Sequence, residues 1–280
     1  MPSCRVFTQQ TVVRRVASSR VLRAGARMAP PAPKLVFRQL FDSESSTYTY
    51  IIGDAESREA AIIDPVKEKV DRDLSMVKEM GLELVLAADT HAHADHVTAV
   101  GAIKDRLPRV KTAIGAGAGA GCADAELKEG EAVRVGGLEI QVLATPGHTA
   151  GCVSYYLPAH GLVFTGDALL VRGCGRTDFQ HGDSSRLYDS VHSRLFSLPD
   201  DTIVYPAHDY QGRTASTIGE EKAFNPRLSK GKAEFIEIMG GLGLPYPKRM
   251  DAAVPANLRC GREGKDGADA PARADEPGKE

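Results

Sequence analysis

Four side chains that commonly bind metal ions lie within six residues of one another near the middle of this 280-residue chain. They are His91, His93, Asp95 and His96, in the run His-Ala-His-Ala-Asp-His. A neutral imidazole offers a nitrogen lone pair and a carboxylate offers anionic oxygen, a combination that suits divalent transition metals. In an extended segment, His91, His93 and Asp95 would project to the same side. Because four such groups would repel or desolvate one another without a cation, we predict a metal site here.

Three more polar side chains follow predicted strands. His148 lies in a Thr-Pro-Gly-His-Thr turn, Asp167 ends the run Phe-Thr-Gly-Asp, and His208 lies in Tyr-Pro-Ala-His-Asp. Loops at one rim of a rigid sheet core are a common place for a site. We therefore expect these groups to join the cluster at 91–96. The other histidines lack this context and are interpreted as ordinary loop or surface residues: His160, His181 and His192.

The elements that must position these groups are two sets of short apolar strands, each interleaved with helices. The predicted strands are 35–41, 48–52, 60–63, 82–87, 110–114, 133–135, 138–143, 152–157, 161–165 and 202–205. The predicted helices are 66–77, 97–107, one capped by Asp183 or Ser184, and one containing 235–239. This pattern favours two packed sheets with helices outside. The glycine-rich run 115–121 lacks the Gly-Lys-Ser/Thr ending of a phosphate loop, so we expect a flexible surface loop.

Composition excludes several classes of protein. Hydrophobic residues make up 42% of the chain, which is enough for a sizeable core. No uninterrupted apolar run reaches the roughly 18–20 residues of a membrane-spanning helix. A net charge of −2 gives no reason to expect nucleic acid as a partner. The five cysteines are odd in number and form no C-x-x-C pair, so we expect neither a disulfide framework nor a zinc ribbon, and a reducing compartment.

The two ends of the chain differ in composition from the middle. Residues 1–34 hold seven basic residues and no acidic one, with no long apolar core. This is typical of an organellar transit peptide, mitochondrial rather than plastid, followed by a Pro-rich linker. The alternative is a basic tail that has no targeting function. Translation from Met28 could give a cytoplasmic form. Residues 262–280 have the composition of a disordered tail. A catalytic domain is thus predicted over 35–261.

The ordered series H-x-H-x-D-H, P-G-H-T, G-D and a late His resembles the metallo-β-lactamase fold superfamily. The resemblance implies an α/β (α+β) fold, an αββα sandwich of two packed mixed sheets with helices on the outer faces and the metal at one edge. Residues 166–180, 205–210 and 254–261 resemble its persulfide dioxygenase branch more narrowly. That branch implies one Fe(2+) ion per chain and the oxidation of glutathione persulfide by O2 to sulfite and glutathione, in the mitochondrial matrix.

The resemblance also implies roles for individual residues. The implied iron ligands are His91, His148 and Asp167. Two imidazoles and one carboxylate make a facial triad that leaves open positions on an octahedral ion. The groups implied to surround the ligands, or to orient the substrate sulfur by hydrogen bonding, are His93, Asp95, His96, His208 and Tyr210. Those implied to bind or shape the glutathione moiety are Arg176 and Thr177.

Alternatives remain open for these residues. His93, Asp95, His96 and His208 are types that hold a second metal in binuclear relatives. Arg176 could instead pin its own loop, and Tyr210 could simply pack at the rim. The rival activity is that of a glyoxalase II-like binuclear hydroxyacylglutathione hydrolase, and a non-catalytic metal-binding member of the fold is a third interpretation. The sequence leaves a homodimer open, and any sulfurtransferase partner would be a separate chain.

Overall fold

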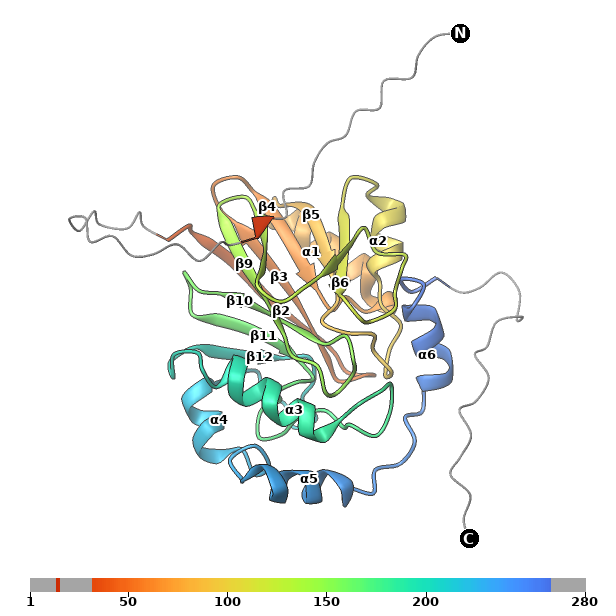
Figure 1. The fold of residues 1–280 in the computed structure, drawn as a ribbon. Coiled ribbons are helices and arrows are strands. Elements are labelled where there is room, and N and C mark those ends of the chain that lie inside the picture. Colours follow the sequence, from red (N-terminus) through yellow and green to blue (C-terminus); the bar gives the residue numbers. More distant parts are fainter. Residues whose placement is uncertain (1–13, 16–31, 263–280) are drawn as a thin grey trace, which may run out of the picture.

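Two β-sheets packed face to face form the centre of the protein (Figure 1). The structure is a computed structural model that describes residues 14–15 and 32–262. One sheet has the order β2-β3-β4-β5-β6-β7 and the other β1-β8-β9-β10-β11-β12-β13. The strands of the first are β2 (Leu35–Asp42), β3 (Thr47–Asp54), β4 (Glu59–Ile63), β5 (Glu83–Ala88), β6 (Lys111–Gly115) and β7 (Ala125–Leu127). Those of the second are β1 (Arg14–Arg15), β8 (Glu131–Val135), β9 (Leu138–Ala144), β10 (Val153–Leu157), β11 (Leu162–Gly166), β12 (Ile203–Pro206) and β13 (Ser216–Thr217).

Both sheets are mixed, and helices cover their outer faces. In the first sheet β4, β5, β6 and β7 pair in parallel, and in the second β11 pairs in parallel with β12. The helices that follow strands of the first sheet are η1 (Lys67–Lys69), α1 (Val70–Glu79) and α2 (Val100–Arg106). The later helical segments are α3 (Ser184–Ser190), the π-helical turn η2 (Val191–Leu195), α4 (Ile218–Phe224), α5 (Lys232–Gly240) and α6 (Met250–Asn257). The predicted αββα sandwich is therefore confirmed.

Alternation along the strands explains the layers. In β3, Tyr50 and Ile52 point between the sheets, whereas Ile51 points outward into the cluster that contains Val70 and Ile103 of the helices. Neighbouring side chains of a strand point to opposite faces, so a strand buried on both faces is apolar at nearly every position. A third cluster packs the other sheet against the later helices, with Phe235 among its fully buried members.

Five elements of the described structure were not predicted from the sequence. The strands β1, β7 and β13 have two, three and two residues, too few to show a periodicity. The helix α4 has seven residues, and α6 contains Pro255, a residue that argues against a helix interior. The run 115–121 is a loop as expected from residue 116 onward. Gly115 ends β6, and a side chain there would lie 2.1 Å from the carbonyl oxygen of Gly151.

One disulfide joins Cys122 to Cys260, contrary to the expectation from the cysteine count. The two residues are 138 positions apart, so no local spacing motif marks the pair. Cys152 and Cys174 are free and buried. Burial raises the pKa of the Cys174 thiol to about 11, which makes that thiol a poor nucleophile at neutral pH.

The predicted transit peptide and linker of residues 1–34 and the predicted tail lie almost wholly outside the described residues, so these domain boundaries stay predictions. Within the described residues, no helix is long and apolar enough to cross a membrane.

Asp54 fastens two turns to each other, and we expect its removal to produce a pH-dependent loss of stability. Its carboxylate accepts hydrogen bonds from the backbone N–H groups of Gly137, Glu56 and Ser57. The bonds from Gly137 and Glu56 lower the pKa of Asp54 from 3.8 to about 2. A carboxyl with a lower pKa in the folded state stabilises the fold above its unfolded pKa, and this contribution is lost as the pH falls through the folded pKa.

Asp54→Asn is therefore expected to lower the free energy of unfolding by about 1–2 kcal/mol at neutral pH. The difference from wild type should shrink between pH 4 and pH 2. Urea unfolding of metal-free protein at both ends of this range measures it. A difference that stays constant with pH would contradict the role of the ionised carboxylate.

Candidate metal centre

The predicted ligands meet at one edge of the sandwich, where several strands end. His91 follows β5, His148 lies between β9 and β10, and Asp167 directly follows β11. A nitrogen of each imidazole and an oxygen of Asp167 all lie within 4.8 Å of one another. The rings of His91 and His148 are edge to face, with centroids 4.9 Å apart. The structure thus brings together three side chains that are separated by up to 76 residues in the sequence.

Hydrogen bonds orient both imidazoles. The Nδ1–H of His148 donates to the carbonyl oxygen of Arg176 at 2.6 Å, and the free Nε2 lies 3.5 Å from Oδ2 of Asp167. The Nδ1–H of His91 donates to Oγ1 of Thr90 at 3.0 Å. The Thr90 hydroxyl in turn donates to Oδ2 of Asp64 at 3.0 Å. Partners of this kind fix the tautomer and leave Nε2 of each ring available to a cation.

The electrostatic surroundings keep the first two imidazoles of the cluster neutral. Burial, together with the neighbouring imidazoles, lowers the pKa of His91 and of His93 well below the usual value. A neutral ring keeps its lone pair at physiological pH, which metal binding requires.

A second group of potential ligands lies beside the first and consists of His93, Asp95 and His208. The Nε2 of His208 lies 3.4 Å from Oδ1 of Asp95 and 3.7 Å from Oδ1 of Asp167. The Nδ1 of His96 lies 2.9 Å from Oδ2 of Asp95. The Nε2–H of His93 donates to Oδ1 of buried Asp64 at 3.1 Å. Four of the five residues predicted to surround the ligands therefore lie at the centre.

Orphaned polar atoms show that these residues fit a metal ion. Within the described residues, seven buried side-chain nitrogen or oxygen atoms lack a hydrogen-bond partner, and three of them are here. They are Nδ1 of His93, Nε2 of His96 and Oδ1 of Asp167. Because buried polar atoms are normally paired, such a concentration of unpaired acceptors indicates a site built for a cation.

The predicted substrate-binding residues lie further out. The Arg176 guanidinium bonds Oδ1 of Asp178 at 2.6 Å and Oδ2 at 2.7 Å, and also the carbonyl oxygens of Pro245 and Leu244. Most of its donors are therefore used within the protein, while its backbone carbonyl orients His148. Arg176 and Thr177 line a cavity of about 500 Å³. Tyr210 is 73% exposed, with its ring stacked on that of His208 at 6.3 Å.

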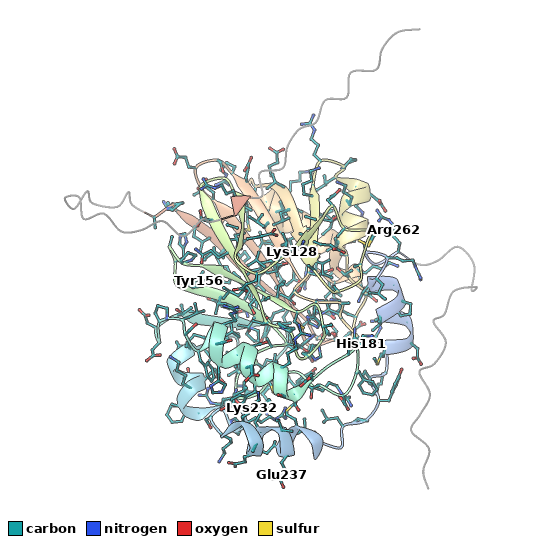
Figure 2. The ribbon with its side chains drawn as sticks, viewed as in Figure 1. Lys128, Tyr156, His181, Lys232, Glu237 and Arg262 are labelled. Atoms are coloured by element: carbon teal, nitrogen blue, oxygen red, sulfur yellow. A yellow bond between two sulfur atoms is a disulfide. The ribbon has the colours of Figure 1, made fainter. Side chains whose placement is uncertain are left out.

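The three histidines interpreted as ordinary residues belong to none of the ligand groups found in the described part of the chain. His160 bonds the carbonyl oxygen of Pro33, and His192 bonds that of Leu228. His181 is exposed in the loop before α3 (Figure 2).

Sequence reasoning did not identify the residues that orient the ligands. The hydroxyl oxygen of Thr47 lies 3.3 Å from Nδ1 of His96 and 3.4 Å from Nδ1 of His208. The side-chain amide of Asn257 donates hydrogen bonds to two backbone carbonyls of the loop 91–96. One of the missed residues carried a signal. Asp64 directly follows the predicted strand 60–63, as Asp167 follows another.

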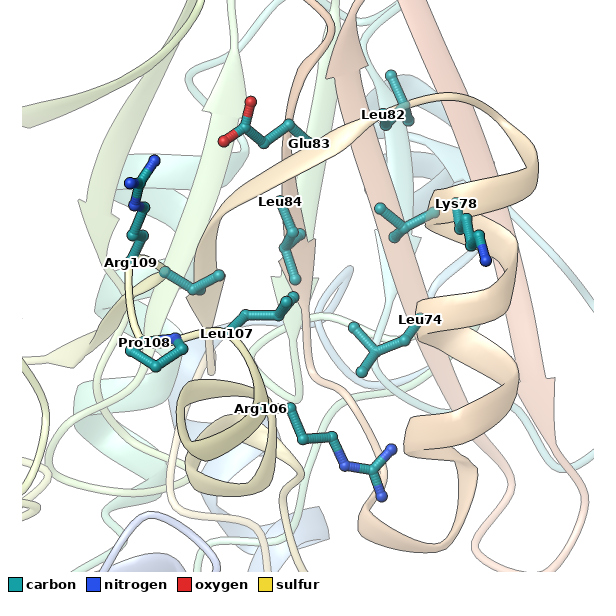
Figure 3. Close-up of a pocket in the computed structure, with 11 residues that line it drawn as sticks. Leu74, Lys78, Leu82, Glu83, Leu84, Arg106, Leu107, Pro108 and Arg109 are labelled. Atoms are coloured by element: carbon teal, nitrogen blue, oxygen red, sulfur yellow. The ribbon is translucent and has the colours of Figure 1, made fainter.

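A larger cavity, of about 600 Å³, lies away from these residues (Figure 3). Leu74 and Lys78 of α1 form one side, and Leu107 and Pro108 of the turn after α2 form the other. None of the candidate site residues lines this cavity, so its size gives no reason to place the chemistry there.

Comparison with known proteins agrees with this geometry. The metallo-beta-lactamase superfamily matches residues 45–208. The human protein "Persulfide dioxygenase ETHE1, mitochondrial" is 49% identical over 249 residues, which cover 89% of this chain and 96% of that one. The crystal structure of ETHE1 from Myxococcus xanthus has a TM-score of 0.79 and 58% identity, covering 81% of this chain and all of that one. This chain belongs to the persulfide dioxygenase branch of the metallo-β-lactamase superfamily. A relative with another activity is less similar to this chain. The hydroxyacylglutathione hydrolase of Thermosynechococcus vestitus is 31% identical to it over 77% of this chain.

Proposed function

We propose that this protein is an Fe(II)-dependent persulfide dioxygenase with one iron ion per chain. Its reaction would convert glutathione persulfide, O2 and water into glutathione, sulfite and two protons. The observation that carries the proposal is the convergence of His91, His148 and Asp167. Two imidazole nitrogens and one carboxylate oxygen of these residues lie within 4.8 Å of one another. This donor set is the facial arrangement used by non-haem Fe(II) oxygenases.

His91, His148 and Asp167 would hold the iron, which when bound supplies electrons and open positions for O2 and the persulfide sulfur. Arg176 fixes the ring of His148 through its carbonyl oxygen, and Thr90 and Asp64 fix that of His91. These contacts hold the two nitrogen lone pairs in place before the substrate arrives, which avoids the cost of ordering them during the reaction.

His208 is suited to stabilise the anionic sulfur of the substrate. Burial opposes its protonation, but the carboxylates of Asp95 and Asp167 raise the pKa of His208 to about 10. Asp95 is not an iron ligand in this proposal, so its carboxylate remains beside Nε2 of His208 and favours a protonated ring, which can donate a hydrogen bond to a persulfide anion. Asp95 orients this ring as well as His96, and Tyr210 stacks on the outer side of His208.

The glutathione moiety would lie toward the cavity lined by Arg176 and Thr177. The Arg176 guanidinium is bound mainly to Asp178, so it would contribute only modestly to binding the carboxylates of the substrate. Its main effect on the substrate would be to hold the shape of the surrounding loop. We place the protein in the mitochondrial matrix, because residues 1–34 have a basic composition and the similar human and mouse proteins are mitochondrial. A sulfurtransferase on a separate chain would be a natural supplier of the persulfide.

An oxygen-electrode assay joined to metal analysis tests the proposal. Protein loaded anaerobically with Fe(II) should contain one iron per chain, consume one O2 for each glutathione persulfide, and release sulfite. The same sample should hydrolyse S-lactoylglutathione barely or not at all.

The rival is a binuclear hydroxyacylglutathione hydrolase, and one observation favours it. His93, Asp95 and His208 form a second group that could hold a second ion. Two zinc ions per chain together with thioester turnover in the assay above would establish this rival and overturn the dioxygenase proposal.

A further inference from the structure

The helix α6 comes from the far end of the described chain, yet it contacts the metal-binding loop 91–96 directly. The side-chain amide of Asn257 donates hydrogen bonds to the carbonyl oxygens of His93 at 2.8 Å and His96 at 2.9 Å. Its Oδ1 accepts from the backbone N–H of Thr98 at 2.8 Å. Asn257 is 2% exposed. One buried amide therefore satisfies three backbone groups of a loop that has no helix or strand ladder of its own.

Close packing holds α6 at this position. Ala253 and Ala256 form a small apolar cluster with Val97. The backbone N–H of Gly101 donates to the carbonyl oxygen of Cys260 at 2.9 Å, and a side chain at Gly101 would lie 2.3 Å from that oxygen. Figure 1 shows α6 beside α2 and apart from α4 and α5. The segment that follows α6 is thus packed too closely against the start of α2 for either to shift alone.

A disulfide also holds the segment that follows α6 in place. Cys260 lies three residues after Asn257, and its disulfide partner Cys122 belongs to the segment between β6 and β7. Cys260 is 5% exposed, whereas Cys122 is exposed. Two ion pairs also attach the segment around α6 to the rest of the protein: Arg249 pairs with Glu68, and Arg262 pairs with Asp105. Of these attachments, only the disulfide responds to the thiol redox state.

We propose that Asn257 is a positioning residue for the metal-binding loop, and that the Cys122–Cys260 disulfide makes its grip on that loop sensitive to redox state. Two molecules of a low-molecular-weight thiol would reduce the bond. The first thiolate attacks the exposed Cys122 sulfur and displaces the Cys260 thiolate. The second thiolate attacks the sulfur of the small thiol now bound to Cys122, which releases the Cys122 thiolate and the disulfide of the two small thiols. The protein gains two electrons and two protons and ends with two thiols.

Reduction leaves the other attachments of α6 in place, so we expect a looser loop rather than an unfolded one. Packed networks of this kind carry couplings that correspond to about 2- to 30-fold changes in affinity. Direct loss of the amide should act more strongly, since partners behind the ligands typically change metal affinity by about 10–100-fold.

Fe(II) affinity, measured anaerobically by competition with a chromophoric chelator, tests the first half of the proposal. Asn257→Asp keeps the acceptor for Thr98 but turns two donations to carbonyls into repulsions. We expect it to weaken Fe(II) binding by about 10–100-fold and to speed hydrogen exchange of residues 91–98. Asn257→Ala should do the same. If Asn257→Asp binds Fe(II) as wild type does, the positioning role is wrong.

Reduction tests the second half. Wild type treated with a phosphine reductant, which is then removed, should bind Fe(II) about 2- to 30-fold more weakly than the oxidised protein. Cys122 lies outside α6, so Cys122→Ser removes the disulfide without altering that helix. The Fe(II) affinity of this variant should equal that of the reduced protein and should not change with the reductant. Equal affinities of oxidised and reduced wild type would overturn the redox part. Both measurements concern metal binding and loop protection, so they hold whether or not the protein oxidises persulfides.

Discussion

Asp167→Asn is expected to abolish metal binding under conditions in which wild type binds one ion per chain. The carboxylate is the anionic member of a group of three donors within 4.8 Å. An amide of the same shape donates no charge, and its NH2 group presents hydrogens to the cation if it turns inward. The loss of affinity should exceed the roughly 10–100-fold typical of residues behind the ligands. Inductively coupled plasma mass spectrometry after gel filtration measures the bound metal, and activity should fall with it.

The fold should survive this substitution. Asp167 follows β11 rather than filling the core, and its Oδ1 has no hydrogen-bond partner in the structure. Far-UV circular dichroism of the variant should therefore match that of metal-free wild type. His91→Ala and His148→Ala should behave in the same way.

His160→Asn provides a matched control for the histidine variants, because His160 precedes β11 at the end opposite to Asp167. It should keep its metal. One iron per chain retained by both Asp167→Asn and His91→Ala would refute this choice of ligands.

The sequence indicated where a site would lie because the candidate ligands follow strands that are apolar enough to recognise, whereas the choice of His91, His148 and Asp167 among them came from the resemblance to a known family. His91 follows β5 of one sheet, and His148 and Asp167 follow β9 and β11 of the other, so all three lie on loops at the rim of the sheet core. The order of those strands also made the two-sheet architecture predictable. Such information is local, and it needs only the residues on either side of the strand end.

What the sequence could not predict depends on contacts across the chain. Asn257 holds the loop 91–96 from about 160 residues away, with an amide that in the sequence looks like any other. Cys122 and Cys260 pair across a similar distance. The role of Arg176 was uncertain for the same reason, since its guanidinium also binds the carbonyl oxygens of Leu244 and Pro245, which are 68 and 69 residues away. A pattern of residue types along the chain cannot show such pairs, because the fold alone brings them together.

Gly147→Ala is expected to damage both the fold and the metal centre, although glycine to alanine adds only a methyl group. Gly147 has a φ of +138°, in a region that side chains disfavour. A Cβ at this position would lie 2.3 Å from both the nitrogen and the Cα of Leu187, in the backbone of α3. Neither backbone can yield without moving something else. Leu187 is fully buried, and the next residue, His148, is bonded to the carbonyl oxygen of Arg176.

The cost of Gly147→Ala should therefore combine backbone strain with overpacking, about 2–5 kcal/mol in the free energy of unfolding. Displacement of His148 by even about 1 Å should lower turnover by about a hundredfold in molecules that remain folded. Gly161→Ala separates the two causes, because Gly161 also has a positive φ, of +61°, but a Cβ there would meet nothing within 4 Å. That control should lose only about 1–2 kcal/mol and keep full activity per bound metal. Denaturant unfolding and activity normalised to metal content compare the variants, and equal losses in the two would show that the contact with α3 does not position His148.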